Sequence, residues 1–200
     1  MTLPLYHSTG LVLGWAASLR SGCANIIKPK FSASEFWGDV KKYKANKFIY
    51  VGELCRYLMN LPASETDKSN SIVQISGNGL RPDIWDSFQK RFNIKKIVEI
   101  YGATEAVGMT VNSFGRSGMI GRKRSDSTII HCNKDDGSPI LNEQGYCTKI
   151  SEGETGLYIQ KISSSAKFQG YLDAQASNKK ILQNVFNEGC LLYTSDAADE

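Results

Sequence analysis

The sequence has few features of an extracellular, zinc-binding or membrane-spanning protein. Its five cysteines are odd in number, lie far apart and include no Cys-x-x-Cys pair. Neither a disulfide framework nor a zinc site is therefore indicated, and we expect reduced, mostly buried thiols. The opening residues lack the charged and apolar segments of a secretory signal. The apolar run at residues 11–19 is shorter than the roughly twenty residues that a membrane-spanning helix needs.

The sequence also lacks a strong excess of either charge. It has 24 Lys and Arg against 20 Asp and Glu, a net charge of +4. This balance excludes a disordered polyelectrolyte, and we predict no nucleic-acid partner. With 41% hydrophobic and 10% aromatic residues, a chain of 200 residues is able to bury a core. We expect a globular protein over most of the length.

Strand-like and helix-like patterns alternate over the first 110 residues. This alternation predicts an α/β fold, a parallel sheet with crossover helices on both faces. The expected strands are residues 24–27, 47–51, 71–75 and 96–100. The expected helices follow a capping box at residues 32–35, run from residue 53 to about 60, and begin at Arg81-Pro82. Residues 11–19 are expected to form a buried helix after a loop.

From residue 111 onward the pattern changes to short strands and turns, such as 127–131 and 157–162. We therefore predict an α/β layer at 1–110 and a β-rich subdomain at 111–189. Three further expectations are local. Glu53 and Arg56 are expected to form an ion pair. The basic cluster is expected to be a solvated loop, and the three tryptophans to be core. The cluster is Arg116, Arg122, Lys123 and Arg124, and the tryptophans are Trp15, Trp37 and Trp85.

Two polar motifs follow expected strands. Gly77-Asn78-Gly79 comes after one strand, and Tyr101-Gly102-Ala103-Thr104-Glu105 comes after the next. In parallel sheets, ligands bind beyond the carboxyl ends of the strands. The Tyr101 ring suits a base, the Thr104 hydroxyl a phosphate oxygen, and the Glu105 carboxylate Mg²⁺. Alone, the pentapeptide fits equally well a strand that ends in a glycine turn before a capped helix.

Several motifs together resemble one family. Residues 3–10, 77–82 and 101–105 have the order and approximate spacing of adenylate-forming acyl-CoA synthetases. Residues 30–37, 50–58, 153–157 and 168–171 look like the branch of very-long-chain acyl-CoA synthetases and fatty acid transport proteins. The resemblance covers about residues 3–189, and the block 50–58 is its most branch-specific part.

The resemblance implies a two-step ligase. A fatty acid carboxylate attacks the α-phosphorus of ATP and releases pyrophosphate, and the thiol of coenzyme A then displaces AMP from the acyl adenylate. ATP, Mg²⁺ and coenzyme A are the implied cofactors and substrates. Fatty acid and coenzyme A are the implied partners, and a role in fatty acid uptake is also implied. Family members are membrane-associated with a cytosol-facing domain, at the endoplasmic reticulum, peroxisome or plasma membrane, through segments that would precede Met1.

The resemblance also implies roles for single residues. Thr104 would contact the α-phosphate, and Glu105 would bind Mg²⁺. Tyr101, Gly102 and the backbone of residues 77–79 would surround the adenine.

A second group of residues would form the acyl pocket. His7 would lie near its carboxylate end, and Gly10, Gly14 and the helix at 11–19 would help to line it. A core or helix-capping role is the alternative for His7.

Other family motifs are absent. These are the Gly/Ser/Thr-rich phosphate loop, the ribose-binding Asp motif, the hinge and the catalytic lysine. We therefore expect residues 1–189 to be part of an AMP-binding domain and residues 190–200 to be a foreign tail. Three functional hypotheses stay open: an internal fragment of a fatty acid–CoA ligase, inactive by itself; a non-catalytic acyl- or nucleotide-binding form of the same fold; and an unrelated α/β nucleotide-binding protein.

Overall fold

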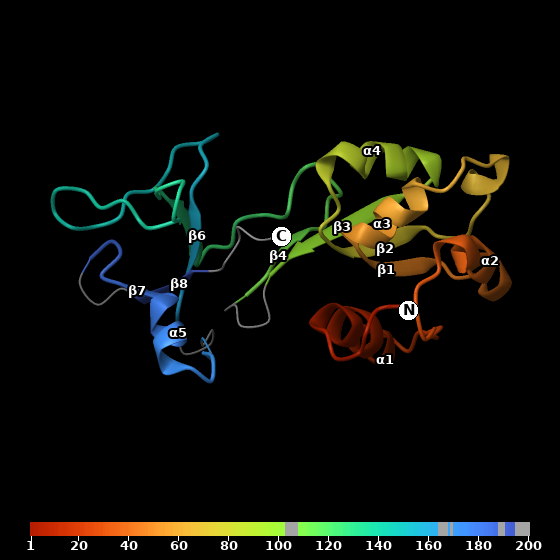
Figure 1. Ribbon diagram of the computed structural model, residues 1–200, viewed down its shortest axis with the longest axis horizontal. Coiled ribbons are helices and arrows are strands. Elements are labelled where there is room, and N and C mark those ends of the chain that lie inside the picture. The colour runs from red at the N-terminus through yellow and green to blue at the C-terminus, as the bar shows by residue number, and fades with distance from the viewer. Residues whose placement is uncertain (103–107, 164–167, 169, 188–190, 195–200) are drawn as a thin grey trace. The chain divides into compact units, whose positions relative to one another are not determined.

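The computed structural model describes residues 1–102, 108–163, 168, 170–187 and 191–194, the last of these as backbone only. The chain forms two compact units (Figure 1). Unit 1 comprises Met1–Tyr101 and Val111–Gly121, and unit 2 comprises Gly102–Thr110 and Arg122–Glu200. Residues 102–110, predicted for the α/β layer, thus belong to unit 2, and residues 111–121, predicted for the β-rich subdomain, belong to unit 1.

The sheet of unit 1 has the order β1-β2-β3-β4. Its strands are β1 (Lys47–Val51), β2 (Gln74–Asn78), β3 (Lys96–Tyr101) and β4 (Thr110–Asn112). The first three strands are parallel, and Lys47, Gln74 and Lys96 lie side by side in register. The predicted parallel α/β sheet is therefore confirmed, and the carboxyl ends of β1, β2 and β3 lie side by side.

Helices cover both faces of this sheet (Figure 1). On one face lie α2 (Ala33–Tyr43), α3 (Gly52–Met59) and α4 (Pro82–Arg91). Phe48, Ile75 and Ile97 point from the strands into the core that these helices share. The π-helix η1 (Thr9–Ala16) contacts β1 and β2 and continues into α1 (Ala17–Arg20), while a short 3₁₀ helix, η2 (Glu65–Lys68), lies between α3 and β2.

The helix of residues 11–19 differs from the prediction. Four of its large side chains are exposed, whereas Thr9, Gly10 and Gly14 are buried. The prediction of a buried apolar helix is wrong because the helix backbone approaches its neighbours through its smallest residues. The exposed side chains are Leu11, Val12, Trp15 and Leu19. Of the expected core tryptophans, Trp85 is buried, Trp37 is partly buried and Trp15 is 39% exposed.

Three other local predictions are also wrong in detail. Residues 24–27 form no strand, and their neighbour Lys28 donates its amide to the Met1 carbonyl instead (2.9 Å). The strand predicted at 71–75 is β2, which begins three residues later; before it, the Asn70 side chain accepts from the Ile72 amide (2.9 Å). Ser32 begins α2 without a side-chain cap, so the predicted capping box does not form.

Unit 2 is built on an antiparallel sheet of order β5-β6-β8-β7. Its elements are β5 (Ser127–Ile130), β6 (Leu157–Lys161), α5 (Ala174–Lys179), β7 (Ile181–Gln183) and β8 (Leu191–Thr194). A β-rich region was predicted here. The strand β8 lies within residues 190–200, and the foreign origin of those residues stays a prediction.

Candidate functional site

Gly77-Asn78-Gly79 ends β2 in a turn, which we call the glycine turn. Both of its glycine positions are unfavourable for a residue with a Cβ. A Cβ on Gly77 would lie 2.0 Å from the carbonyl oxygen of Tyr50 in the neighbouring strand. Gly79 has φ +76°, a left-handed conformation that residues with a Cβ rarely adopt. The turn therefore keeps the backbone of β2 close against the end of β1.

Gly52 supports this turn from the start of α3. A Cβ on Gly52 would lie 1.7 Å from the carbonyl oxygen of Gly79. The two backbones thus touch where β1 passes into α3. Sequence reasoning missed this role, although a glycine directly after a strand, inside the branch-specific block 50–58, is a signal of close backbone approach.

A buried carboxylate on the neighbouring strand β3 binds the backbone directly after the turn. Glu99, on β3, is 3% exposed and accepts hydrogen bonds from the Tyr50 hydroxyl and from the Leu80 amide (3.1 Å to the latter). Burial raises the pKa of Glu99 above its usual value, although its hydrogen bonds act in the opposite direction. Burial and the nearby Glu99 charge also raise the pKa of Tyr50 far above its usual value.

Sequence reasoning missed this pair as well. Tyr50, Leu80 and Glu99 come from three separate segments, and only the fold brings them together. One signal was present: Glu99 is two residues from Ile97, so a strand places both on the same face. A carboxylate that faces a core needs donors, and it finds them in the Tyr50 hydroxyl and the backbone after Gly79.

The predicted His7 segment caps the helix η1. The His7 amide donates to the Pro4 carbonyl (3.2 Å), and the His7 carbonyl accepts from the Leu11 amide (2.9 Å). The imidazole is exposed, and its Nδ1 accepts from the Thr9 amide at 3.3 Å. His7 is therefore not a core residue. Its side chain bonds the first amide of η1, the capping alternative, and a further role in an acyl pocket stays a prediction.

Thr9 joins this segment to the glycine turn. Its side chain is buried, and its Oγ1 donates to Oδ1 of Asn78 at 3.2 Å. Gly10 is required here by packing, since a Cβ would lie 2.2 Å from the Pro4 carbonyl oxygen. Gly14 lies against the Met1 thioether, a flexible end that is able to shift. The structure thus brings two predicted motifs, 69 residues apart, into one constellation.

The pentapeptide motif is described in part. Tyr101 is the last residue of β3 and is partly buried. Gly102 is exposed, and a Cβ on it would lie 3.0 Å from Cβ of Met109. Thr104 and Glu105 lie outside the described residues. Among the residues that the structure does describe, no three His, Cys, Asp or Glu side chains gather into a metal-binding group, and Glu99 already bonds Tyr50 and Leu80.

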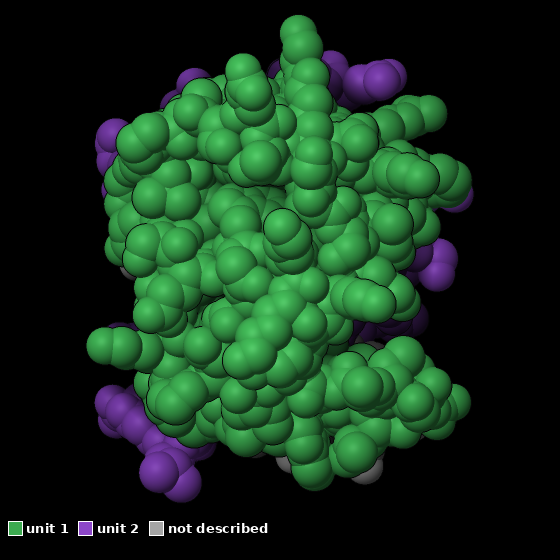
Figure 2. Space-filling view, turned by 90° about the vertical axis from the view of Figure 1, so that its right-hand side faces the viewer, with its two compact units in different colours: residues 1–101, 111–121 green, residues 102–110, 122–200 purple. Residues whose placement is uncertain are grey.

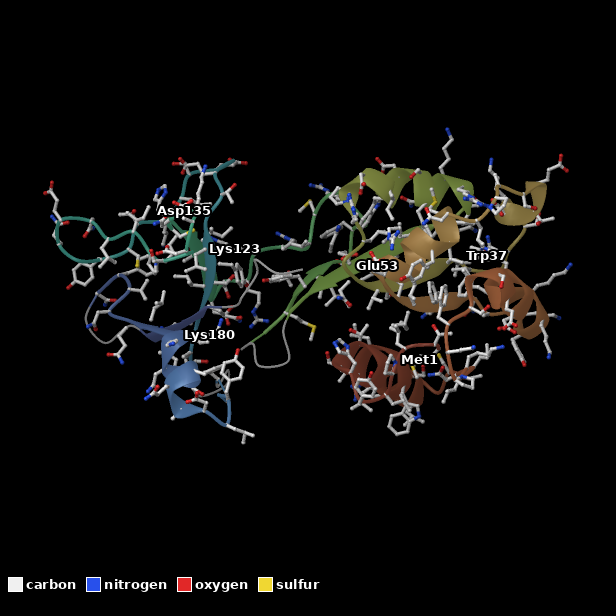
Figure 3. All side chains as sticks on the ribbon, viewed as in Figure 1. Met1, Trp37, Glu53, Lys123, Asp135 and Lys180 are labelled. Carbon is white, nitrogen blue, oxygen red and sulfur yellow. The ribbon has the colours of Figure 1, made fainter. Side chains whose placement is uncertain are left out.

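Two charged groups for which the sequence predicted no binding role form ion pairs with residues close to them in the sequence. Arg56 and Glu53, at the start of α3 where Figure 3 labels Glu53, are joined by a bidentate ion pair with Nη2–Oε2 at 2.6 Å. From the basic cluster, Arg124 pairs with Asp126 at 2.9 Å. The predicted Glu53–Arg56 ion pair is confirmed.

The glycine turn and the residues around it combine a rigid backbone with polar groups. Close backbones, a left-handed glycine and a buried carboxylate form a rigid turn at the carboxyl ends of parallel strands. Such edges are where α/β sheets bind ligands. Asn78 and Thr9 add an amide and a hydroxyl, which are suited to hydrogen bonding with a polar ligand.

Comparisons with known proteins agree with this geometry. A family model described as AMP-binding enzyme matches residues 1–156. Long-chain fatty acid transport protein 3 of Mus musculus is 39% identical over 202 residues, a match that covers 98% of this chain and 30% of that protein. Medium/long-chain-fatty-acid–CoA ligase FadD6 of Mycobacterium tuberculosis is 36% identical, over 97% of this chain and 33% of its own length. The chain thus spans about a third of these relatives.

Solved structures show the same fold. ATP-bound MatB from Rhodopseudomonas palustris superposes with a TM-score of 0.68 at 16% identity, over 96% of this chain and 38% of that one. A benzoate CoA ligase from Burkholderia xenovorans gives a TM-score of 0.64 at 16% identity, over 95% and 39%. The family model and the relatives at 36–39% identity exclude the hypothesis of an unrelated nucleotide-binding protein. The predicted resemblance is confirmed, and the chain belongs to the AMP-binding enzymes.

Proposed function

We propose that this chain is part of a long-chain fatty acid–CoA ligase. In that reaction ATP and a fatty acid form an acyl adenylate and pyrophosphate, and coenzyme A then takes the acyl group and releases AMP. The observation that carries the proposal is the Thr9–Asn78 hydrogen bond. It joins the segment proposed for the acyl carboxylate to the turn proposed for the adenine, so both halves of an acyl adenylate would have neighbouring contacts.

In this proposal each segment has one task. The turn of residues 77–79 positions the adenine, together with Tyr101 and Gly102. The His7 segment, with Gly10 and Gly14, adjoins the acyl end. Thr104 is proposed to contact the α-phosphate. Such positioning supplies most of the catalysis of adenylyl transfer, because little covalent chemistry is left to the protein.

Mg²⁺ and coenzyme A belong to the proposal too. A single carboxylate, that of Glu105, is proposed as a ligand of Mg²⁺, a hard cation that prefers oxygen. The metal would neutralise phosphate charge. The relatives' printed names include fatty acid transport proteins, and we propose that the whole protein acts at a membrane on its cytosolic side. Among the described helices, none has the length and apolar character needed to cross a bilayer.

Binding of a stable acyl-adenylate mimic tests the constellation. The probe is a palmitoyl sulfamoyl adenosine, titrated calorimetrically against the chain and its variants. We expect Asn78→Ala to weaken binding by about tenfold, the loss of one polar contact. Asn60→Ala, an exposed asparagine at the end of α3, is the matched control and should leave binding unchanged. Equal binding by both variants would contradict the assignment of Asn78.

Activity is tested on the whole protein that contains this chain. We expect Glu105→Ala to reduce Mg²⁺-dependent pyrophosphate release by at least about a hundredfold. The 200-residue chain itself is expected to form no acyl-CoA. A normal rate from the Glu105→Ala protein would overturn the metal assignment. A whole protein that binds the mimic tightly but never releases pyrophosphate would instead support the non-catalytic form.

A further inference from the structure

Positive charge gathers at the amino-terminal ends of the strands of the unit 1 sheet, opposite to the glycine turn at their carboxyl ends. Residues 40–52 and 87–98 contain eight Lys or Arg and no Asp or Glu. The segment between their strands, residues 69–80, carries no charged side chain at all. The net charge of the entire chain is only +4, so this charge is concentrated rather than spread evenly.

Sheet register brings the two basic segments together. Lys47 begins β1 and Lys96 begins β3, and both are paired with Gln74 of β2. Two strand spacings separate them, about 10 Å. Both precede a residue that points into the core, Phe48 or Ile97, so both lie on the other face of the sheet, in one row.

Neighbouring backbone contacts extend this row. The Asn46 carbonyl accepts from the Val73 amide (2.9 Å), and the Val73 carbonyl accepts from the Lys96 amide (3.1 Å). Lys44 follows the last residue of α2, between that helix and β1, with its amide bonded to the Lys41 carbonyl (3.3 Å). We call the six exposed lysines of this region the basic edge. They are Lys41, Lys42, Lys44, Lys47, Lys95 and Lys96.

The basic edge has no internal neutralisation. In the described part of the chain, none of the six lysines lies in an ion pair. Among the eight basic residues of the two segments, Arg91 does form an ion pair, with Asp67. Arg91 also donates to the carbonyls of Met59 and Leu61, so its charge stabilises the fold. Figure 2 views unit 1 from the side of α2, and several long side chains stand out from this face.

Apolar side chains lie among these lysines. Tyr43 is 46% exposed, with the Lys42 ammonium 5.1 Å from its ring centre, and Val73 is 41% exposed between Asn46 and Lys96. A tyrosine with exposed lysines around it is typical of surfaces that meet the headgroup region of a membrane. Flexible lysines suit a diffuse field of phosphates better than one defined ligand.

We propose that the basic edge docks unit 1 onto an anionic membrane surface. Clusters of four to eight basic residues are the usual size for attraction to acidic lipids. The choice of a lipid surface over a nucleic acid rests on the proposed function, because a long-chain fatty acid dissolves in bilayers. The surface lies at the strand edge opposite to the glycine turn, so the turn stays open to soluble nucleotide while the edge meets the lipid.

Sedimentation with sucrose-loaded vesicles tests the docking. The chain is mixed with phosphatidylcholine vesicles, either pure or with about 30% phosphatidylserine, in about 0.1 M salt and without ATP. We expect at least about tenfold stronger partitioning onto the anionic vesicles, and its loss in about 0.5 M salt. Equal partitioning onto the two kinds of vesicle would overturn the proposal.

A matched pair of variants locates the surface. In the first, Lys44, Lys47, Lys95 and Lys96 are replaced by Gln. In the second, four exposed lysines of unit 2 are replaced, so the net charge changes equally; these are Lys123, Lys134, Lys161 and Lys179. Since each lysine near an anionic surface contributes roughly fivefold, the first set should reduce partitioning at least about twentyfold. The second should reduce it by less than about threefold. An equal reduction would show a net-charge effect only and would overturn the proposal.

Two further arms keep the outcome unambiguous. Circular dichroism checks folding. If the variant with four Lys→Gln substitutions is unfolded, the double variant Lys47→Gln with Lys96→Gln should still lower partitioning at least about fivefold.

A mixed-sequence oligonucleotide that displaces the chain from vesicles through the same lysines, where inorganic phosphate does not, would assign the basic edge to nucleic acid and overturn the lipid proposal. Vesicle binding needs no adenylation, so whole protein that sediments with vesicles but forms no adenylate contradicts the proposed function alone.

Discussion

The two units differ most in how much apolar surface they bury. Among the described side chains, the core of unit 1 contains fifteen buried residues and that of unit 2 contains four. Unit 1 places three helices against one face of a parallel sheet, whereas the antiparallel sheet of unit 2 has long connections of turns around it. Because the burial of apolar surface is the main driving force of folding, unit 1, which contains the glycine turn, is expected to be the more stable of the two units.

Matched core truncations test this comparison most strongly. Ile97 in β3 and Ile159 in β6 are both fully buried, and changing either to Ala should cost about 2–5 kcal/mol. All three tryptophans lie in unit 1, so their fluorescence reports that unit alone.

We expect Ile97→Ala to lower the fluorescence midpoint in urea. Ile159→Ala should leave that midpoint in place and shift only the transition seen by circular dichroism. If Ile159→Ala moved the fluorescence midpoint as much as Ile97→Ala does, the units would unfold as one block, and their separate stabilities would have no meaning.

Glycines at close backbone contacts provide the next largest effects. A Cβ at Gly52 of unit 1 would meet the Gly79 carbonyl oxygen at 1.7 Å, and one at Gly156 of unit 2 would meet the Ile130 carbonyl oxygen at 2.3 Å. Gly52→Ala should cost about 3 kcal/mol, measured by urea unfolding. Gly156→Ala should cost less, because a smaller core is able to shift more easily.

Gly38 in α2 is the control, with nothing within 4 Å of its Cβ position. Gly38→Ala should stabilise unit 1 by up to about 1 kcal/mol, as expected for a helix interior. A cost at Gly156 above that at Gly52 would reverse the ranking of the two units.

The buried Tyr50–Glu99 pair distinguishes the units by pH. Glu99 is the single buried charged side chain among the described residues, and it lies in unit 1. Its pKa is raised in the folded state, mainly by burial, so folding favours its protonated form. The stability that this provides is complete below the ordinary pKa of a glutamic acid and is lost as the pH rises through the raised value.

We therefore expect Glu99→Gln to flatten the pH dependence of unit 1 stability as the pH rises above the ordinary pKa of a glutamic acid. Fluorescence midpoints in urea measure it. Tyr50→Phe, which leaves the carboxylate with one donor fewer, should cost about 1–3 kcal/mol at neutral pH. An unchanged slope in the Gln variant would show that another group controls the titration.

Local sequence patterns predicted most of the fold. Residues 47–51 and 96–100 alternate or cluster apolar side chains between clear helix signals, and they match β1 and β3 closely. The errors arise from polar contacts that a pattern of apolar residues does not show. Before β2, the Asn70 side chain binds the Ile72 amide two residues later, and the helix η1 places Thr9 where it bonds Asn78, 69 residues away. Only the first of these contacts is local enough to be sought in the sequence.

The site was predicted in outline. The sequence placed Gly77-Asn78-Gly79 at a strand end, and the structure confirms that position. Gly52 contacts Gly79, 27 positions away, and Glu99 binds Leu80, 19 positions away. Spacing along the chain could not reveal these two contacts, which hold the turn in place. Period-two alternation alone would have shown that Glu99 shares the face of Ile97, and a carboxylate on a core face always requires partners.

Exposed ion pairs provide the smallest expected effect and the last test of the comparison. Glu53–Arg56 in unit 1 is well exposed to solvent, and Arg124–Asp126 in unit 2 is partly exposed. Water and salt screen such pairs, so Arg124→Ala should cost well under about 1 kcal/mol, and Arg56→Ala should leave the urea midpoint of unit 1 within experimental error. The small effect of Arg124→Ala should vanish in about 0.5 M salt. If Arg124→Ala instead unfolded unit 2, polar contacts rather than its apolar core would hold that unit together, and core size would no longer explain why the two units differ.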